Sequence, residues 1–358
     1  MSNHAMKPIS QEHKTLDMVA YDNLYRQCQQ SSILQSAAYG EAKRLIEGFE
    51  VERKGIMDSD NTIALYQVLM KRLPIIGKVA RINRGPLYMR SDPSSLDDLK
   101  RLYRSLYEEW VIRRGFFLQI APNVTDDIMS SGDLAESGFT RSNEPNWQSG
   151  WLRLNQSDEA LRKALQQKWR NLLNKSEKME TELHHVENEK DLEAILVEYD
   201  RFMKERNFQS TSSHLIRAMY RQSSATLYAT MAKKEGRYLG AIIIAKHGDS
   251  CTYLVGVTSD EGRKTNANYL LLWNGLLHCR DAGFQWFDVG GIDEINTPGI
   301  AHFKKGLGFI SYRLIGEFEG HRGFRYQLLS RLKRYYYRRG LKKKDAHAAR
   351  EEVHSEGR

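Results

Sequence analysis

The sequence lacks any long apolar run. The longest, residues 239–245, includes Gly240 and is far shorter than the roughly 20 apolar residues with which a helix crosses a bilayer. We therefore expect no membrane span. The first 15 residues are polar and have no apolar core followed by a small-residue cleavage site. This absence argues against export.

Cysteine is scarce and scattered. The chain has three cysteines, Cys28, Cys251 and Cys279. Neither a disulfide framework nor a clustered metal site fits this number and spacing, whereas a reducing compartment does. We expect three buried thiols, no bound metal and a cytoplasmic protein.

The sequence also lacks a recognisable dinucleotide loop. Gly290 and Gly291 follow a predicted strand, but the G-x-G-x-x-G spacing and the following helix are missing. Acyl-CoA is disfavoured for a similar reason. Asn266 and Asn268 stand where an acetyltransferase places glycines that let pyrophosphate approach a helix N-terminus, so their side chains would obstruct that approach. We expect no cofactor.

What the chain does have is enough apolar material for two globular domains. It contains 358 residues, of which 41% are hydrophobic, and one core rarely grows beyond roughly 250–300 residues. Its net charge of +9 is unevenly distributed. Residues 331–358 carry an excess of 6 positive charges and residues 162–178 an excess of 5. Such clusters favour an anionic partner, although each alone is also typical of a solvated helical face.

An internal near-repeat organises the chain. In the first half, residues 62–70, 80–83 and 116–121 read as strands, with an amphipathic helix at 95–114 that ends at Gly115. The second half repeats this order. Its strands are expected at 238–246, 251–257, 284–289 and 312–318, its helix at 267–281 ending at Gly283. Gly115 and Gly283 lie 168 residues apart, and the Gly-Phe pairs at 138 and 308 lie 170 apart. A duplication explains this ordered series.

The order of strand pair, helix, strand, Gly-Phe and strand is similar to that of the GNAT acyltransferase fold. Helices are expected between the halves at 157–178, with Ser157 as N-cap, and at 191–205. We predict an α/β (α+β) chain of two tandem GNAT-like domains. The first domain covers 1–155 and holds the acceptor-substrate cleft, the second covers 156–326 with the linking helices, and a basic tail covers 327–358.

Five short motifs follow one another along the chain. They are Leu34-Gln35-Ser36 with Tyr39-Gly40-Glu41-Ala42-Lys43, Arg84-Gly85-Pro86, Lys168-Trp169-Arg170-Asn171, Phe287-Asp288-Val289-Gly290-Gly291-Ile292, and Phe303-Lys304. In this order they resemble the FemABX family of peptidoglycan interpeptide-bridge aminoacyltransferases, which includes lipid II:glycine glycyltransferases. The resemblance runs from about residue 22 to residue 320, without the inserted helical arm of several relatives.

The resemblance implies transfer of an aminoacyl group from aminoacyl-tRNA to an amine of a cell-wall precursor. It assigns Lys304 to the developing charge at the reacting carbonyl, and Lys43 and Arg206 to precursor phosphate. Arg84 and Tyr88 are expected to shape the acceptor cleft. The sequence departs from the family after Arg206, where residues 210–214 replace a further Arg and Tyr, so a nucleotide-linked muramyl peptide is only one candidate acceptor.

The chemistry of the residues fits this role. Acyl transfer to an amine needs a donor aimed at the oxyanion, and one such donor contributes about 3–4 kcal/mol. Lys304 follows a glycine-rich strand end and suits this role, although an exposed loop lysine is the alternative interpretation. Asp288 is predicted to act as base or orienter, and capping of a neighbouring turn is an equally good interpretation. His302 is a weaker candidate base, because a lone histidine is more often structural. Tyr253 and Phe303 are predicted to contact substrate; a half-buried strand aromatic is an equally good interpretation of Tyr253.

The tail places leucines and tyrosines at helical spacing between basic residues. Such a helix can lie on the inner face of an anionic membrane, contact RNA, or pack on the protein with its charges in solvent. We rank packing first.

We therefore predict a cytoplasmic aminoacyltransferase of cell wall biogenesis, active on a nucleotide- or lipid-linked envelope precursor, as a monomer or weak dimer. Two other functions stay open. One is an N-acyltransferase that uses acyl-CoA or acyl carrier protein on an amino sugar of a surface polysaccharide. The other is a catalytically silent protein that binds tRNA or envelope material.

Overall fold

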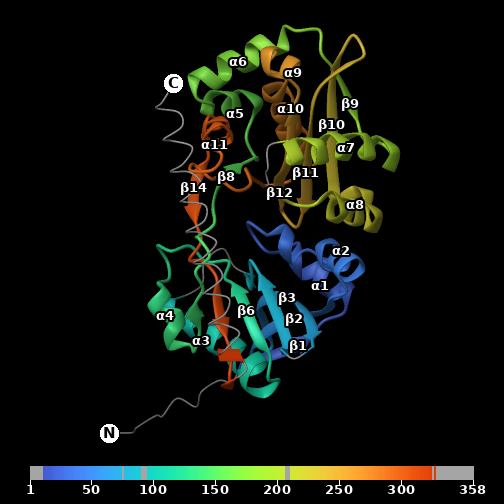
Figure 1. Cartoon of the computed structure of the whole chain (residues 1–358). Helices are drawn as coiled ribbons and strands as arrows, with labels where there is room; N and C mark the ends of the chain where they lie inside the picture. The colour runs from blue at the N-terminus through green and yellow to red at the C-terminus, as the bar shows by residue number, and fades with distance from the viewer. Residues whose placement is uncertain (1–10, 75, 90–94, 206–209, 325, 328–358) are drawn as a thin grey trace, which may run out of the picture.

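The structure, a computed structural model, describes residues 11–74, 76–89, 95–205, 210–324 and 326–327. Two β-sheets lie one above the other, each with its own helices (Figure 1). Two expectations lie outside the described residues: phosphate binding by Arg206, and the helix of the basic tail beyond residue 327. Within the described part of the chain, no helix is long and apolar enough to span a membrane.

The first sheet has the strand order β1-β2-β3-β4-β6-β15-β7, with β5 paired to β3. Its strands are β1 Glu12–Thr15, β2 Glu50–Asp58, β3 Asn61–Leu73, β4 Gly77–Asn83, β5 Leu87–Tyr88, β6 Phe117–Ala121, β7 Thr140–Arg141 and β15 Phe318–Gly320. The helical elements of this half are α1 Met18–Tyr25, η1 Ile33–Gln35, α2 Ala37–Glu47, α3 Leu96–Tyr107, the π-helical turn η2 Glu108–Arg113, and α4 Ser131–Glu136.

The second sheet has the order β14-β8-β13-β12-β11-β10-β9. Its strands are β8 Gln148–Arg153, β9 Glu182–His185, β10 Leu227–Lys234, β11 Arg237–His247, β12 Ser250–Thr258, β13 Trp286–Asp288 and β14 Ile310–Arg313. Its helical elements are α5 Asp158–Ala164, α6 Gln167–Glu177, α7 Glu189–Glu205, α8 Ser213–Gln222, η3 Ser224–Thr226, α9 Asp260–Lys264, α10 Ala267–Asp281 and α11 Pro298–Lys305.

The two sheets exchange strands in a symmetric way. In the first sheet, β4 and β6 are parallel, and β15 from the end of the chain follows β6 in antiparallel pairing. In the second sheet, β12 and β13 are parallel, and β8 from the first half follows β13 in antiparallel pairing. The domain boundary at residue 155 stays a prediction. The strand β8, which precedes that boundary, belongs to the second sheet, and β15, which follows it, belongs to the first sheet.

The expected internal repeat is confirmed by these matching sheet orders and by its glycine landmarks. Gly115 and Gly283 have φ values of 68° and 85°, and Gly138 and Gly308 have 98° and 73°. All four therefore occupy the left-handed region, which side chains disfavour. The repeat preserves the backbone geometry of each turn as well as the order of the elements.

The apolar run of β11 is explained by burial on both faces. Ile242 and Ile244 pack with α5, α6 and α10, while Ile243 and Ala245 pack with α7 and α8. Because successive strand residues point to opposite faces, a strand covered on both sides is apolar throughout. The second sheet is thus the middle layer of a three-layer sandwich.

Contacts between the β11–β12 turn and the first half join the two parts. Ser31 Oγ lies 3.1 Å from Nδ1 of buried His247, and the Gln30 and Ser31 N–H groups donate to Asp249 at 3.2 and 3.4 Å. Gly248 has a φ of 48°, and a Cβ there would lie 2.4 Å from Ser31 Oγ. The helix α2 also packs against α8 in a shared core.

Several sequence-based boundaries hold and two do not. The helix at 267–281 is confirmed in full as α10, and the three cysteines are buried as expected. The segment 157–178 is two helices, because Leu165 adopts an extended conformation after α5. The last predicted strand, 312–318, is also wrong: the chain leaves β14 and turns at Gly316, with a φ of 109°, before entering β15 of the other sheet.

Candidate active site

Lys304 lies at the centre of the candidate site. It occupies the last turn of α11 and is 7% exposed, so it is not a loop lysine in solvent. Its Nζ donates to the Gly291 carbonyl oxygen at 2.7 Å and lies 5.5 Å from the centre of the Tyr253 ring. Burial lowers the pKa of Lys304 to about 8, and nearby Asp288 offsets part of that fall. The ammonium is therefore poorly solvated but charged at neutral pH.

Asp288 organises the end of β13. Its Oδ1 accepts hydrogen bonds from Ser149 Oγ of β8 and, at 2.7 Å, from the Gly290 N–H, while its Oδ2 accepts from the Tyr312 hydroxyl of β14 at 2.7 Å. Burial and the Asp288 charge raise the pKa of Tyr312 well above its usual value, so the hydroxyl remains a donor. Three elements thus converge on one buried carboxylate.

The glycines after Asp288 bring backbone close to Lys304. Gly290 has a φ of 72°, and a Cβ there would lie 2.5 Å from the Tyr253 carbonyl oxygen and 3.3 Å from Lys304 Nζ. A Cβ on Gly291 would lie 2.6 Å from the Trp147 ring. A side chain at Gly290 would collide with backbone and one at Gly291 with the Trp147 ring, so close packing favours glycine at both positions.

Arg84 reaches this site from the first half. It follows β4, has a φ of 52°, and its guanidinium lies 4.0 Å from the centre of the Trp147 ring. Burial lowers the pKa of Arg84, and the neighbouring Tyr312 and Asp288 oppose that shift. Trp147 therefore has Arg84 against its ring and Gly291 beside it, so one aromatic side chain links the two halves at the site.

Two aromatic residues that were predicted to contact substrate, Tyr253 and Phe303, lie beside Lys304. Tyr253 of β12 is half-buried beneath Lys304, and burial raises the pKa of its hydroxyl. Phe303 of α11 packs 5.1 Å from the Tyr269 ring and 5.9 Å from the Trp169 ring, centre to centre. Phe303 is therefore part of the packing that supports α11, whereas the Tyr253 ring faces the Lys304 ammonium.

The structure does not bring the other predicted residues to this place. His302 is exposed, and as the second residue before Lys304 it lies about 200° around the helix. Lys43 of α2 pairs with Glu47 and lies 5.6 Å from the centre of the Phe49 ring. Tyr88 of β5 packs against the first core, where burial raises the pKa of its hydroxyl.

Sequence reasoning missed three residues that the fold delivers. Trp147 and Ser149 come from the first half by the strand exchange, and Tyr312 comes from β14. None of them lies in a motif that the sequence singled out. A signal for Tyr312 was its place three residues after the Gly-Phe pair at 308–309.

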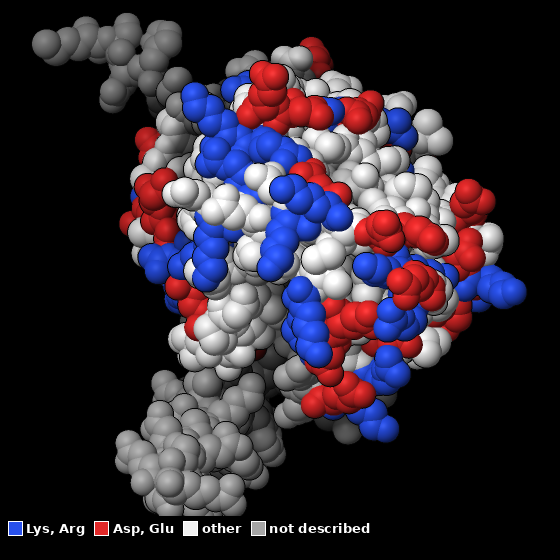
Figure 2. Space-filling model, turned by 90° about the horizontal axis from the view of Figure 1, so that it is seen from above, with Lys and Arg blue, Asp and Glu red and all other residues white. Residues whose placement is uncertain are grey.

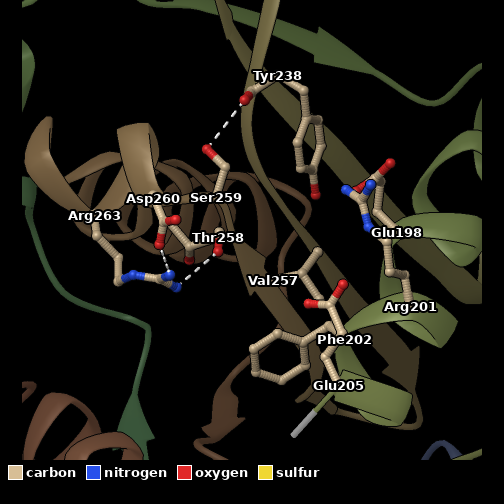
Figure 3. Close-up of a pocket in the computed structure, with 10 residues that line it drawn as sticks. All are labelled: Glu198, Arg201, Phe202, Glu205, Tyr238, Val257, Thr258, Ser259, Asp260 and Arg263. Atoms are coloured by element: carbon tan, nitrogen blue, oxygen red, sulfur yellow. Dashed lines mark hydrogen bonds and ion pairs between the residues drawn. The ribbon is translucent and has the colours of Figure 1, made fainter.

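A pocket of about 220 Å³ lies at the other end of β12, between α7 and α9 (Figure 3). Four of its charged side chains form two ion pairs, Glu198 with Arg201 and Asp260 with Arg263. Another pocket, of about 300 Å³, lies beside β2, β3 and the π-helical turn. Lys304 lines neither of these two pockets.

Comparisons with known proteins agree with this architecture. Residues 16–137 match the FemAB family, and residues 159–305 match the acetyltransferase (GNAT) domain. Among solved structures, the crystal structure of FemX has a TM-score of 0.75 at 17% identity and covers 90% of this chain and 99% of its own. No curated protein sequence matches the chain.

Two further structures share the fold more distantly. A conserved protein of unknown function from Bacteroides thetaiotaomicron VPI-5482 has a TM-score of 0.53 at 11% identity, covering 86% of this chain and 98% of its own. L-PGS from Bacillus licheniformis has a TM-score of 0.51 at 11% identity, covering 90% and 98%. The family matches and the fold together identify the chain as an acyltransferase that resembles the FemABX family, with a FemAB-type first half and a GNAT-type second half.

Proposed function

We propose that this acyltransferase moves an aminoacyl group from aminoacyl-tRNA to an amine of a nucleotide- or lipid-linked precursor of the cell wall. The FemAB match and the fold shared with FemX support this class of reaction. Because charged tRNA and its synthetases are cytoplasmic, the proposed reaction takes place in the cytoplasm or at the inner face of the membrane.

The environment of Lys304 is the observation that carries the proposal. An ammonium has three N–H groups, and in the described part of the chain only the Gly291 carbonyl accepts one of them. Two N–H groups are therefore left for a reacting carbonyl. In a buried site of low dielectric, such a donor stabilises a developing oxyanion far more than it would in water.

The proposed reaction follows from this placement. The acceptor amine attacks the ester carbonyl of the donor, and the carbonyl oxygen becomes an oxyanion beside Lys304 Nζ. A C–N bond forms, the ester C–O bond breaks, the amine loses a proton and the departing 3′-oxygen of the RNA gains one. Asp288 accepts hydrogen bonds from three groups, so we assign it to positioning the Gly290–Gly291 turn rather than to proton transfer.

Arg84 is proposed to bind the acceptor. In the described residues its guanidinium contacts the Trp147 face and has no carboxylate partner. A guanidinium with free N–H groups presents a planar fork that matches phosphate or carboxylate. Lys43 and Arg206, which the family resemblance assigns to phosphate, remain proposals for more distant parts of the same substrate.

The second candidate is acyl transfer from acyl-CoA to an amino sugar. The match of residues 159–305 to a GNAT acetyltransferase domain favours it. Against it, Asn266 stands at the start of α10 with a φ of 59°, and the Oδ1 of Asn268 is buried there without a partner among the described residues. We expect the side chains of Asn266 and Asn268 to obstruct the approach of pyrophosphate to the N-terminus of α10.

A donor comparison tests the proposal. Purified protein is incubated with an amino-sugar or muramyl-peptide acceptor and with one of two labelled donors, aminoacyl-tRNA or acyl-CoA. We expect transfer from aminoacyl-tRNA that ribonuclease abolishes, and none from acyl-CoA. Transfer from acyl-CoA that resists ribonuclease would establish the second candidate and refute the first.

A further inference from the structure

Helix α6 carries a stripe of polar and basic side chains along one side. Lys168, Asn171, Lys175 and the C-cap residue Lys178 are all exposed and fall within an arc of about 80° around the helix axis. We call these four residues the α6 stripe. Figure 2 views the end of the molecule that carries α5, α6 and α9, and Lys and Arg side chains gather over one part of that face.

The lysines of the α6 stripe have no acidic partner in the described part of the chain. Elsewhere on the surface, arginines pair with a carboxylate one helical turn away, as Arg101 does with Asp98. The one acidic residue within α6, Glu177, is held instead by both terminal nitrogens of Arg162 from α5. The stripe is therefore a row of uncompensated charge.

Local helix physics disfavours part of this arrangement. Lys168 lies in the first turn of α6, where the positive end of the helix dipole repels a cation and where this helix has no acidic residue. Lys175 and Lys178 are three residues apart, which places two like charges side by side. The helix dipole stabilises Lys175 and Lys178 because they lie at the C-terminal end of α6, whereas Lys168 has no such compensation.

The opposite side of α6 supports the active site. Trp169 is buried, its Nε1 donates to the Phe303 carbonyl at 3.1 Å, and a Cβ on Gly306 would lie 2.4 Å from its ring. Phe303 and Gly306 lie on either side of Lys304 in the sequence. The α6 stripe and Lys304 thus lie on two sides of one helix, whose diameter is about 10 Å.

We propose that the α6 stripe binds the sugar-phosphate backbone of the donor RNA. This inference rests on the proposed function and adds where the donor docks. Lysine ammonium groups bind phosphate, and the Asn171 amide can bond phosphate or ribose oxygens, so binding reads the backbone and not the base sequence. Lys168 and Lys178 are about 15 Å apart along the axis, long enough to engage several phosphates.

The composition of α6 favours RNA over a membrane surface. A helix that lies on lipid turns large apolar residues toward the bilayer beside its cations. In α6, Trp169 and Leu173 are buried against the protein core, and the stripe has asparagine between its lysines. Leu172, the apolar residue beside the stripe, is only partly exposed, so this surface offers mainly charge and hydrogen bonds.

Binding of uncharged bulk tRNA to the full-length chain tests the docking without any chemistry. The variant Lys168→Gln/Lys175→Gln/Lys178→Gln keeps good helix formers. We expect this variant to bind tRNA at least about tenfold more weakly than wild type does. The slope of log K against log salt should be smaller in magnitude by roughly 2. The matched control, Lys14→Gln/Arg72→Gln/Lys190→Gln, removes the same charge from exposed side chains on β1, β3 and α7. It should bind like wild type.

Two further measurements separate the possible failures. Transfer from an aminoacylated trinucleotide, which lacks the helical part of tRNA, should be unchanged in the stripe variant. If the wild-type protein transfers an aminoacyl group from neither tRNA nor the trinucleotide, the proposed function is wrong. The tRNA binding data still test whether the α6 stripe binds RNA. Equal tRNA binding by the stripe and control variants would overturn the docking. Loss of binding to phosphatidylglycerol vesicles with tRNA binding intact would also overturn it.

Discussion

Replacement of Lys304 by methionine separates a catalytic lysine from a structural one. Methionine keeps an unbranched chain of similar length and removes only the charge and its donors. If Lys304 is kept for catalysis, the variant should lose activity and retain stability. If Lys304 is structural, the variant should lose stability and retain activity.

The expected stability follows from the lysine's environment. Its pKa falls from 10.5 to about 8 on folding, a change of 2.5 units that corresponds to about 3 kcal/mol against the charged form. Methionine removes this cost. It also removes the hydrogen bond to the Gly291 carbonyl, worth about 1.5–3 kcal/mol for a charged donor. At pH 7 the two nearly cancel, so Lys304→Met should unfold within about 1 kcal/mol of wild type.

The pH dependence has a definite sign. Between pH 8 and 10.5 the folded lysine is neutral while the unfolded lysine still binds a proton. The wild-type free energy of unfolding therefore rises with pH in this window, relative to the variant, by up to about 3 kcal/mol. Denaturant unfolding at pH 7, 8, 9 and 10 measures it. Turnover should fall about 10²–10³-fold in the variant at pH 7.

The neighbouring Lys305 provides a control. Its side chain is 45% exposed and pairs with Glu294, so Lys305→Met should change both turnover and stability little. A Lys304→Met protein that loses 3 kcal/mol or more at pH 7 but keeps its turnover would refute the catalytic assignment. A stability difference that does not vary with pH would refute the assigned burial of charge.

Three other substitutions test the surroundings. Gly290→Ala should cost at least about 1–2 kcal/mol of unfolding free energy because its φ is positive, and should lower turnover, whereas Gly299→Ala, with open space around the new Cβ, should do neither. Asp288→Asn should lower the pKa of Lys304 further, since Asp288 raises it, so the alkaline loss of activity moves to lower pH; an unmoved pH–rate profile would show that the two are not coupled. Lys43→Ala should raise the KM for a phosphate-bearing acceptor with kcat unchanged, and an unchanged KM would sink its assignment to phosphate.

Local signals predicted the elements near the site well. The helix α10 follows from apolar periodicity and its terminal glycine, and Gly115 and Gly283 take the left-handed conformation that a helix end needs. Lys304 and Asp288 were singled out from short motifs, and the structure places both in one buried cluster. Each of these features depends on neighbouring residues in the chain, so sequence alone contains the necessary information.

Long-range pairing was beyond sequence reasoning. The exchange of β8 and β15 joins segments more than 130 residues apart, as in the hydrogen bond from Ser149 to Asp288. A strand's partner is chosen by tertiary packing, and nothing in residues 148–153 specifies which sheet receives them. The burial of Lys304 was equally hidden, because α11 has only 8 residues, too few for the helical period of apolar residues to identify a core position.

A co-crystal structure with a non-hydrolysable aminoacyl-adenosine, in which an amide replaces the ester at the 3′-position, tests the central claim most directly. The account predicts that its carbonyl oxygen lies within hydrogen-bond distance of Lys304 Nζ, above the Tyr253 ring. A ligand seated in the pocket beside Tyr238, with Lys304 still bonded to Gly291 alone, would contradict it.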